Sequence, residues 1–154
     1  MAPSIQDEHG KAILRLSMGV LLHTLIENIE AKINGDNGTK LYLYSGHDSS
    51  VMPVLAALGM EIESWPPYCS NVIIELWRKP DGKHVVRCFF NGEEIAIPNV
   101  PQGSQPTLET FKTEVLGPFI LSQEKWGKAC QVKVSHEGSL PQPDKPISAM
   151  DDEE

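Results

Sequence analysis

The segment Leu41-Tyr42-Leu43-Tyr44-Ser45 is followed directly by Gly46-His47-Asp48-Ser49-Ser50. We expect residues 41–45 to form a central strand, because alternating leucines and tyrosines would make both of its faces apolar or aromatic. Residues 50–58 are expected to form a helix, with one of the two serines at its start as the N-cap. This order places His47 and Asp48 at the carboxyl end of a strand and beside the start of a helix. Open α/β folds bind ligands at that position, and the N–H groups of a helix start attract anions.

The segments on either side predict one long helix and a hairpin. Apolar residues at three- and four-residue spacing predict an amphipathic helix over residues 8–33. Residues 72–78 and 85–90 predict two strands. The turn Pro80-Asp81-Gly82-Lys83 joins them, because proline presets φ and glycine tolerates a positive φ. A β-hairpin is therefore expected.

Two further elements are expected after the hairpin. Residues 94–97 predict a short strand, and residues 107–116 predict a helix with Thr107 as its N-cap. The order helix, strand, helix, hairpin, helix is typical of a layered α/β domain. These elements include few strands that could pair with the strand at 41–45. We therefore expect part of the sheet to lie outside this chain, and an edge of that strand to remain unpaired.

Composition limits the classes of function. The chain has 154 residues, of which 40% are hydrophobic and 22% charged, and this is typical of one globular domain. The formal net charge of −8 argues against binding to nucleic acid, which needs a basic face. We find no apolar run near the ~20 residues that span a membrane, and no signal-peptide pattern at the amino terminus. The composition leaves the compartment and the oligomeric state undecided.

The cysteines and the carboxyl-terminal tail add little chemistry. The three cysteines, Cys69, Cys88 and Cys130, show no C-x-x-C spacing, so a zinc site is not expected. Their odd number means that at least one thiol is free or pairs outside this chain.

From about residue 135 the composition shifts to Ser, Pro, Asp and Glu. We expect a domain over residues 1–134 and a disordered acidic tail over residues 135–154.

The His47–Asp48 pair is compatible with more than one role. It could serve phosphate chemistry, in which histidine contacts a phosphate and the carboxylic acid protonates a leaving oxygen. It could bind a metal as in the helical HD-type phosphohydrolases, but the other histidines lack ligand spacing and the pair follows a strand. A serine hydrolase would need G-x-S-x-G, which the sequence around the pair does not match. A purely structural role is also open, in which Asp48 caps a helix by accepting backbone N–H bonds.

Several segments together resemble the histidine acid phosphatases, a branch of the histidine phosphatase superfamily. The resemblance covers residues from about 15 to 130, and it is closest to the eukaryotic acid and lysophosphatidic acid phosphatases. The segments that carry it are Leu43-Tyr44-Ser45-Gly46-His47-Asp48 with Val51, Pro66-Pro67-Tyr68, Glu75-Leu76, Asn91-Gly92-Glu93 and Leu116-Gly117-Pro118. It implies an α/β fold, a layered sheet with flanking helices, and hydrolysis of phosphate monoesters without a metal or other cofactor.

The resemblance also implies roles for residues. In the family a histidine of an Arg-His-Gly-x-Arg-x-Pro motif attacks phosphorus and forms a phosphohistidine, which water then hydrolyses. By position, His47 would contact the phosphate and Asp48 would donate a proton to the leaving alcohol. In the animal enzymes a cysteine placed like Cys130 pairs with one in the amino-terminal part. Cys130 is therefore expected to be unpaired here.

The sequence departs from the family in one respect. Arg-His-Gly-x-Arg-x-Pro does not occur in it, and Glu8-His9-Gly10 lacks both arginines and the proline. We therefore expect the chain to correspond to the carboxyl-terminal part of such a phosphatase, with the amino-terminal half missing and no activity alone. The alternative is a non-catalytic module that binds phosphorylated ligands through His47 and the helix start. A metal-dependent HD-type phosphohydrolase is a minor alternative.

Overall fold

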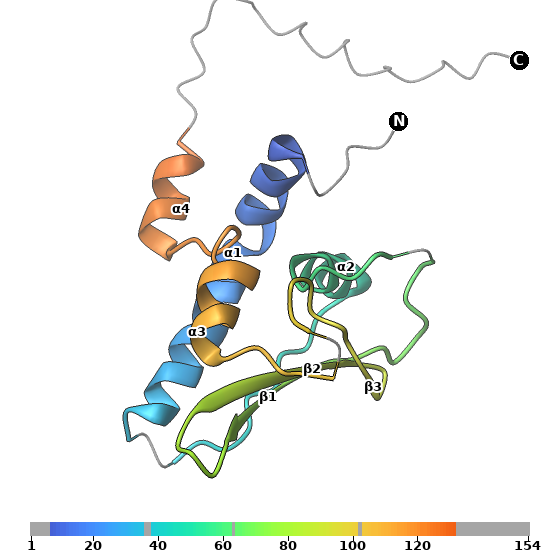
Figure 1. Ribbon diagram of the computed structural model, residues 1–154. Helices are drawn as coiled ribbons and strands as arrows, with labels where there is room; N and C mark the ends of the chain where they lie inside the picture. Colours follow the sequence, from blue (N-terminus) through green and yellow to red (C-terminus); the bar gives the residue numbers. More distant parts are fainter. Residues whose placement is uncertain (1–6, 36–37, 63, 102, 132–154) are drawn as a thin grey trace, which may run out of the picture.

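A computed structural model describes residues 7–35, 38–62, 64–101 and 103–131. Helices and a small antiparallel sheet make up this part of the chain, which confirms the expected α/β class (Figure 1). The elements in chain order are α1 (Glu8–Ile33), α2 (Asp48–Ala57), β1 (Val72–Arg78), β2 (His84–Phe90), β3 (Glu93–Glu94), α3 (Leu108–Thr110), η1 (Phe111–Val115) and α4 (Gln123–Ala129). The predicted tail at 135–154 and its boundary at 134 lie outside the described residues.

Helix α1 has the bounds that its apolar periodicity predicts. The Asp7 carboxylate accepts a hydrogen bond from the Gly10 N–H at 2.7 Å and so caps the first turn. Leu14, Leu22 and Ile26 are buried on the face that meets the rest of the core. Packing of this face against the core stabilises the 26-residue helix.

Helix α1 also bears on the expectation that the chain has no membrane span. By length and composition alone, α1 is long and apolar enough to cross a membrane, and it is the one such helix in the described part of the chain. This is weak evidence, because core helices of soluble proteins and signal sequences pass the same test. Leu22 of α1 is fully buried within the core of this fold.

The hairpin forms where the turn chemistry predicts it. β1 pairs with β2 in antiparallel register from Val72 opposite Phe90 to Arg78 opposite His84. Gly82 in the connecting turn has φ of +84°, which a residue with a side chain rarely adopts.

A second tight turn adds β3 to the edge of β2, so the sheet order is β1-β2-β3. The strand expected over 94–97 is shorter than predicted, since β3 contains Glu93 and Glu94 alone. Beyond Glu94 the chain leaves the ladder and buries Ile95 and Ile97 in the core. Burial of two isoleucines therefore replaces further strand pairing.

The predicted strand over residues 41–45 is wrong. The segment is extended but belongs to no strand in the described residues, and Leu41 and Leu43 are 78% and 88% exposed. An alternating sequence becomes a strand only where a neighbour supplies the ladder of hydrogen bonds. None of the three strands described here pairs with this segment, so both of its edges are unpaired rather than one.

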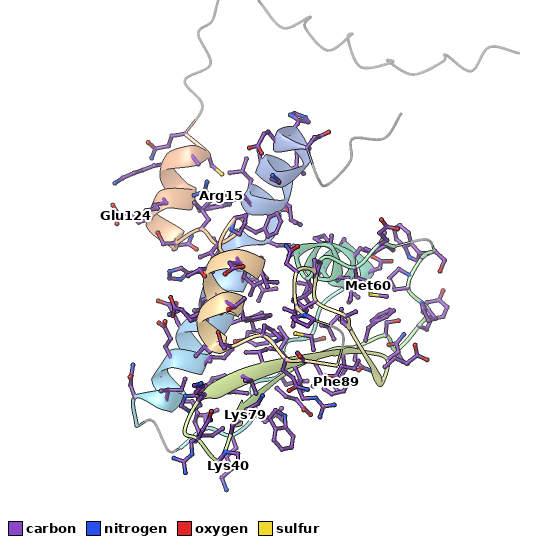
Figure 2. All side chains as sticks on the ribbon, in the orientation of Figure 1. Arg15, Lys40, Met60, Lys79, Phe89 and Glu124 are labelled. Atoms are coloured by element: carbon purple, nitrogen blue, oxygen red, sulfur yellow. The ribbon has the colours of Figure 1, made fainter. Side chains whose placement is uncertain are left out.

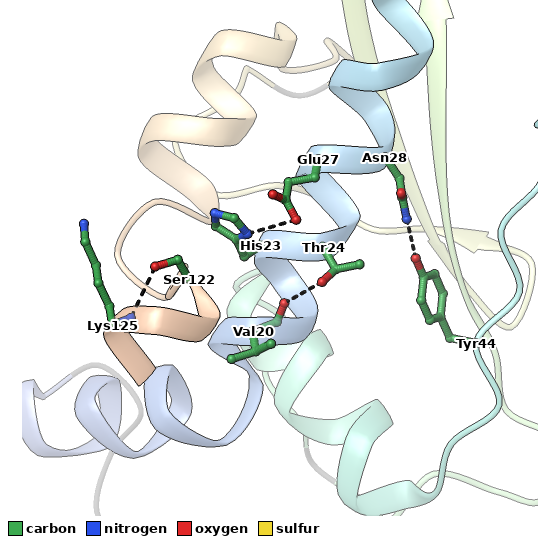
Figure 3. Close-up of polar contacts among 8 residues, drawn as sticks. All are labelled: Val20, His23, Thr24, Glu27, Asn28, Tyr44, Ser122 and Lys125. Atoms are coloured by element: carbon green, nitrogen blue, oxygen red, sulfur yellow. Dashed lines mark hydrogen bonds and ion pairs between the residues drawn. The ribbon is translucent and has the colours of Figure 1, made fainter. Parts of the chain in front are cut away.

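One polar contact ties this segment to α1. The Asn28 side-chain amide donates a hydrogen bond of 2.6 Å to the Tyr44 hydroxyl (Figure 3). Tyr44 is the fourth residue of the segment, and the chain enters α2 just beyond it. The contact therefore links the carboxyl-terminal part of α1 to the backbone that leads to His47.

The core lies between the helices and one face of the sheet. In Figure 1, α2 and α3 lie on the same side of the β1–β2 hairpin, and Figure 2 shows side chains filling the space between these helices and the strands. On β1, Ile74 and Leu76 pack against this core, whereas Ile73 and Trp77 are 45% and 51% exposed on the other face. The largest fully buried side chains are Phe111, Leu22, Leu55, Leu58, Leu116, Val86 and Cys88.

The carboxyl-terminal helices agree only in part with prediction. Thr107 is the N-cap expected for residues 107–116, and its hydroxyl accepts a bond from the Thr110 N–H at 3.1 Å. The segment then divides into the short helix α3 and the wider π-helical turn η1. Helix α4 was not predicted, although Ser122 before it is a suitable N-cap residue.

Candidate functional site

The start of α2 carries both residues of the candidate site. His47 is the N-cap in an extended conformation, with φ of −112° and ψ of 173°, so the prediction of Ser49 or Ser50 as N-cap is wrong. The His47 carbonyl accepts bonds from the Ser50 and Val51 N–H groups at 2.8 and 3.0 Å. The helix therefore begins at Asp48, two residues earlier than predicted. The His47 imidazole makes no capping bond and is exposed.

The residues around the helix start allow this early beginning. Gly46 comes so close to Ser50 that an added Cβ would lie 3.2 Å from the Ser50 Cβ and Oγ atoms. Because α2 begins at Asp48, Pro53 lies in the second turn and not in the first turn, as predicted from the sequence. A proline there lacks the N–H that would otherwise bond the Ser49 carbonyl.

The Asp48 carboxyl group is held at both oxygens. Oδ1 accepts the backbone N–H of Ser49 at 2.6 Å, and Oδ2 accepts the indole N–H of Trp65 at 3.0 Å. A carboxylate in the first turn also interacts favourably with the positive end of the helix dipole. Asp48 therefore has part of the structural role that the sequence left open, while the group itself remains exposed.

Trp65 is a site contact that sequence reasoning did not find. The family resemblance includes Pro66-Pro67-Tyr68 but gives no role to Trp65 before it. Its indole reaches back 17 residues to Asp48, across the length of α2. No periodicity or motif in the sequence indicates a contact of that kind.

The site is an open surface and not an enclosed pocket. Two hollows on the described surface, of about 320 and about 230 Å³, lie elsewhere. The first lies at the carboxyl end of α2, between Gly59, Pro98 and Phe119, and the second lies beside Arg87 and Glu94. Neither hollow is lined by His47 or Asp48, so the pair lies outside both of them.

Among the described residues, the other histidines and acids form no metal-binding group with the pair. Within the described residues, no group of three or more His, Cys, Asp and Glu side chains is placed to hold a metal ion. His23 instead lies on α1, with its Nδ1 atom 3.2 Å from a Glu27 carboxylate oxygen (Figure 3). The HD-type alternative therefore has no ligand set in this part of the chain.

The three cysteines are free thiols in this structure. Cys69 and Cys130 are exposed, and Cys88 is buried in β2. Burial raises the pKa of the Cys88 thiol to about 12, and the nearby Glu94 charge adds to the effect. Cys130 has no disulfide partner among the three cysteines of the chain, and pairing with a cysteine outside it stays a prediction of the resemblance.

Comparison with known proteins identifies relatives over most of the chain. It is 30% identical over 141 residues to human lysophosphatidic acid phosphatase type 6, which covers 88% of this chain and 32% of that protein. It is 30% identical over 132 residues to rat prostatic acid phosphatase, covering 82% and 33%. Counting factor 60 of Dictyostelium discoideum is 34% identical over 101 residues, covering 66% and 24%.

The chain thus spans a quarter to a third of the length of these curated relatives. The family model of the histidine phosphatase superfamily (branch 2) matches residues 5–91, more than half of the chain. That match includes α1, the segment that leads to His47 and Asp48, and the hairpin. The chain belongs to branch 2 of the histidine phosphatase superfamily.

Proposed function

We propose that this chain supplies the phosphate contact and the proton donor of an acid phosphatase-type phosphomonoester hydrolase. The observation that carries the proposal is the position of His47 and Asp48, adjacent and exposed at the start of α2. Membership of the superfamily and the names of the relatives support the class of reaction. The substrate class is therefore a phosphate monoester.

His47 is assigned the phosphate contact. Its imidazole is exposed, so its N–H can donate to a phosphate oxygen without first breaking a capping bond. The positive end of the α2 dipole adds to the attraction for an anion at the same place.

Asp48 is assigned the proton transfer. An alkoxide is a poor leaving group, and a carboxylic acid within reach of the ester oxygen can protonate it as the P–O bond breaks. The phosphoryl group would pass to a histidine nucleophile, and water would then release phosphate. The Arg-His-Gly-x-Arg-x-Pro motif that holds this nucleophile in the family is absent from these 154 residues. We therefore assign no turnover to the chain alone.

A second candidate function is phosphate binding without chemistry. Absence of the nucleophile motif from the sequence, together with an exposed His47, favours it. Such a module would bind phosphorylated ligands through the same imidazole and helix start. The two candidates share the phosphate contact and differ in whether Asp48 acts as an acid.

A titration with inorganic phosphate, followed by ¹H–¹⁵N NMR, tests the contact. We expect saturable shifts of the His47 imidazole and of the first-turn amides of α2. His47→Ala should abolish them, whereas His84→Ala, on β2, should leave them unchanged. Shifts that survive His47→Ala, or no shift at α2 in the unaltered chain, would contradict the proposal.

A further inference from the structure

Trp65 reaches the candidate site from the connector between α2 and β1. Its indole N–H donates to Asp48 Oδ2 at 3.0 Å. Pro66 and Pro67 follow it directly and restrict the backbone that carries the ring. We propose that Trp65 is a positioning residue for Asp48. This inference rests on the proposed role of Asp48 as the proton donor.

The contact selects one orientation of an otherwise exposed carboxyl group. A surface aspartate ordinarily exchanges among staggered χ1 rotamers. Here Oδ1 is bonded to the Ser49 N–H at 2.6 Å, within the helix, and Oδ2 to Trp65, from a different segment. Donors from two segments can be satisfied together only in one orientation. The acid is therefore held in place before a substrate arrives.

The same two donors lie where charge develops during proton transfer. When the ester P–O bond breaks, its electron pair goes to the ester oxygen, which takes the Asp48 proton and leaves as an alcohol. The phosphoryl group passes to an imidazole nitrogen of the nucleophilic histidine of the proposed reaction. Asp48 becomes a carboxylate, and the N–H groups of Ser49 and Trp65 are already aimed at its oxygens. Trp65 thus acts through Asp48 and not on the phosphate.

The exposure of Trp65 makes a clean test feasible. Its ring is 65% exposed, so Trp65→Phe removes the N–H donor with little loss of core packing. Trp77 provides a matched control, because it is 51% exposed and its indole N–H donates to Glu75 Oε2 at 2.7 Å. Both substitutions delete one exposed indole–carboxylate bond, and only the first touches Asp48.

The experiment measures the χ1 rotamer populations of Asp48 in the labelled 154-residue chain, from its three-bond couplings to Cγ. We expect one dominant rotamer in the unaltered chain and in Trp77→Phe, and loss of that dominance in Trp65→Phe. Thermal unfolding of the three proteins should agree, which excludes a general loss of structure. The inference would be overturned if Asp48 populated several χ1 rotamers in the unaltered chain. It would also be overturned if a single rotamer persisted in Trp65→Phe.

A phosphate titration on the same samples separates this inference from the proposed function. The titration is read at His47 in the unaltered chain, where the phosphate contact is proposed. A fixed Asp48 without any phosphate response at His47 would count against the proposed function. Averaging of Asp48 in the unaltered chain, with phosphate binding intact, would count against the positioning role alone.

Discussion

The Asn28 side-chain amide donates a hydrogen bond of 2.6 Å to the Tyr44 hydroxyl, and this bond joins the carboxyl-terminal part of α1 to the segment that leads to His47. The segment has no strand partner in the described part of the chain. A side-chain hydrogen bond, and no ladder of backbone bonds, therefore ties Tyr44 to α1. We expect the position of residues 41–45 relative to α1 to depend on it.

Tyr44→Phe removes this hydrogen bond and keeps the ring. The free energy of unfolding should fall by about 0.5–1.5 kcal/mol, the usual range for one such bond. The ¹H–¹⁵N heteronuclear NOE should fall most over residues 41–47, because the segment loses its tie to α1. Tyr42→Phe is the control, because the Tyr42 hydroxyl has no hydrogen-bond partner among the described residues. An equal fall of the heteronuclear NOE in both variants would contradict the assigned role of the bond.

Gly19→Ala tests the packing of α1 against the segment before α4. An added Cβ would lie 2.7 Å from both the Leu121 Cβ and the Phe119 carbonyl oxygen. Urea unfolding should show a loss of about 1–3 kcal/mol, the cost of overpacking a close contact. Gly127→Ala, in α4, meets nothing within 4 Å and should instead stabilise the helix by about 0.5–1 kcal/mol. The same sign for both changes would be inconsistent with this packing.

The pair Arg87 and Glu94 predicts a pH dependence of stability. Its two hydrogen bonds are 2.9 and 2.8 Å long, and the bond from Arg87 holds the pKa of Glu94 below its usual value. A lowered pKa in the folded state contributes stability above the unfolded-state pKa, and this is lost as pH falls through the folded-state value. Urea midpoints should therefore fall less between pH 6 and 3 in Glu94→Gln than in the unaltered chain.

The three thiols should differ in reactivity. Because burial raises the pKa of Cys88 to about 12, its thiolate is scarce at neutral pH. Iodoacetamide at about pH 8, followed by mass mapping, should modify Cys69 and Cys130 and spare Cys88 until urea is added. Rapid labelling of Cys88 in the folded chain would show that β2 is not packed as described.

The parts of the fold that sequence reasoning located are set by local chemistry. Helix α1 follows from apolar periodicity, and the hairpin follows from a turn whose Gly82 takes a positive φ. His47 and Asp48 could be placed at a helix start because they are adjacent in the sequence and follow a glycine. Each of these features is encoded within one short segment.

The parts that sequence reasoning missed depend on partners elsewhere. Residues 41–45 alternate like a strand, but alternation does not supply a neighbour. Helix α4 is held partly by a bond from the Trp126 indole N–H to the Leu16 carbonyl, which no local pattern indicates. The contact between Trp65 and Asp48 likewise joins two residues that are 17 positions apart, and the repeat of a helix or a strand does not predict it.

The most direct test of the central claim is hydrolysis of an aryl phosphate at about pH 5, where carboxyl groups titrate. The purified chain is compared with Asp48→Asn under the same conditions. The claim that the chain carries the phosphate contact and the acid, but not the nucleophile, predicts no turnover above that of the variant. Turnover that Asp48→Asn abolishes would contradict it, because a nucleophile would then have to lie within these 154 residues.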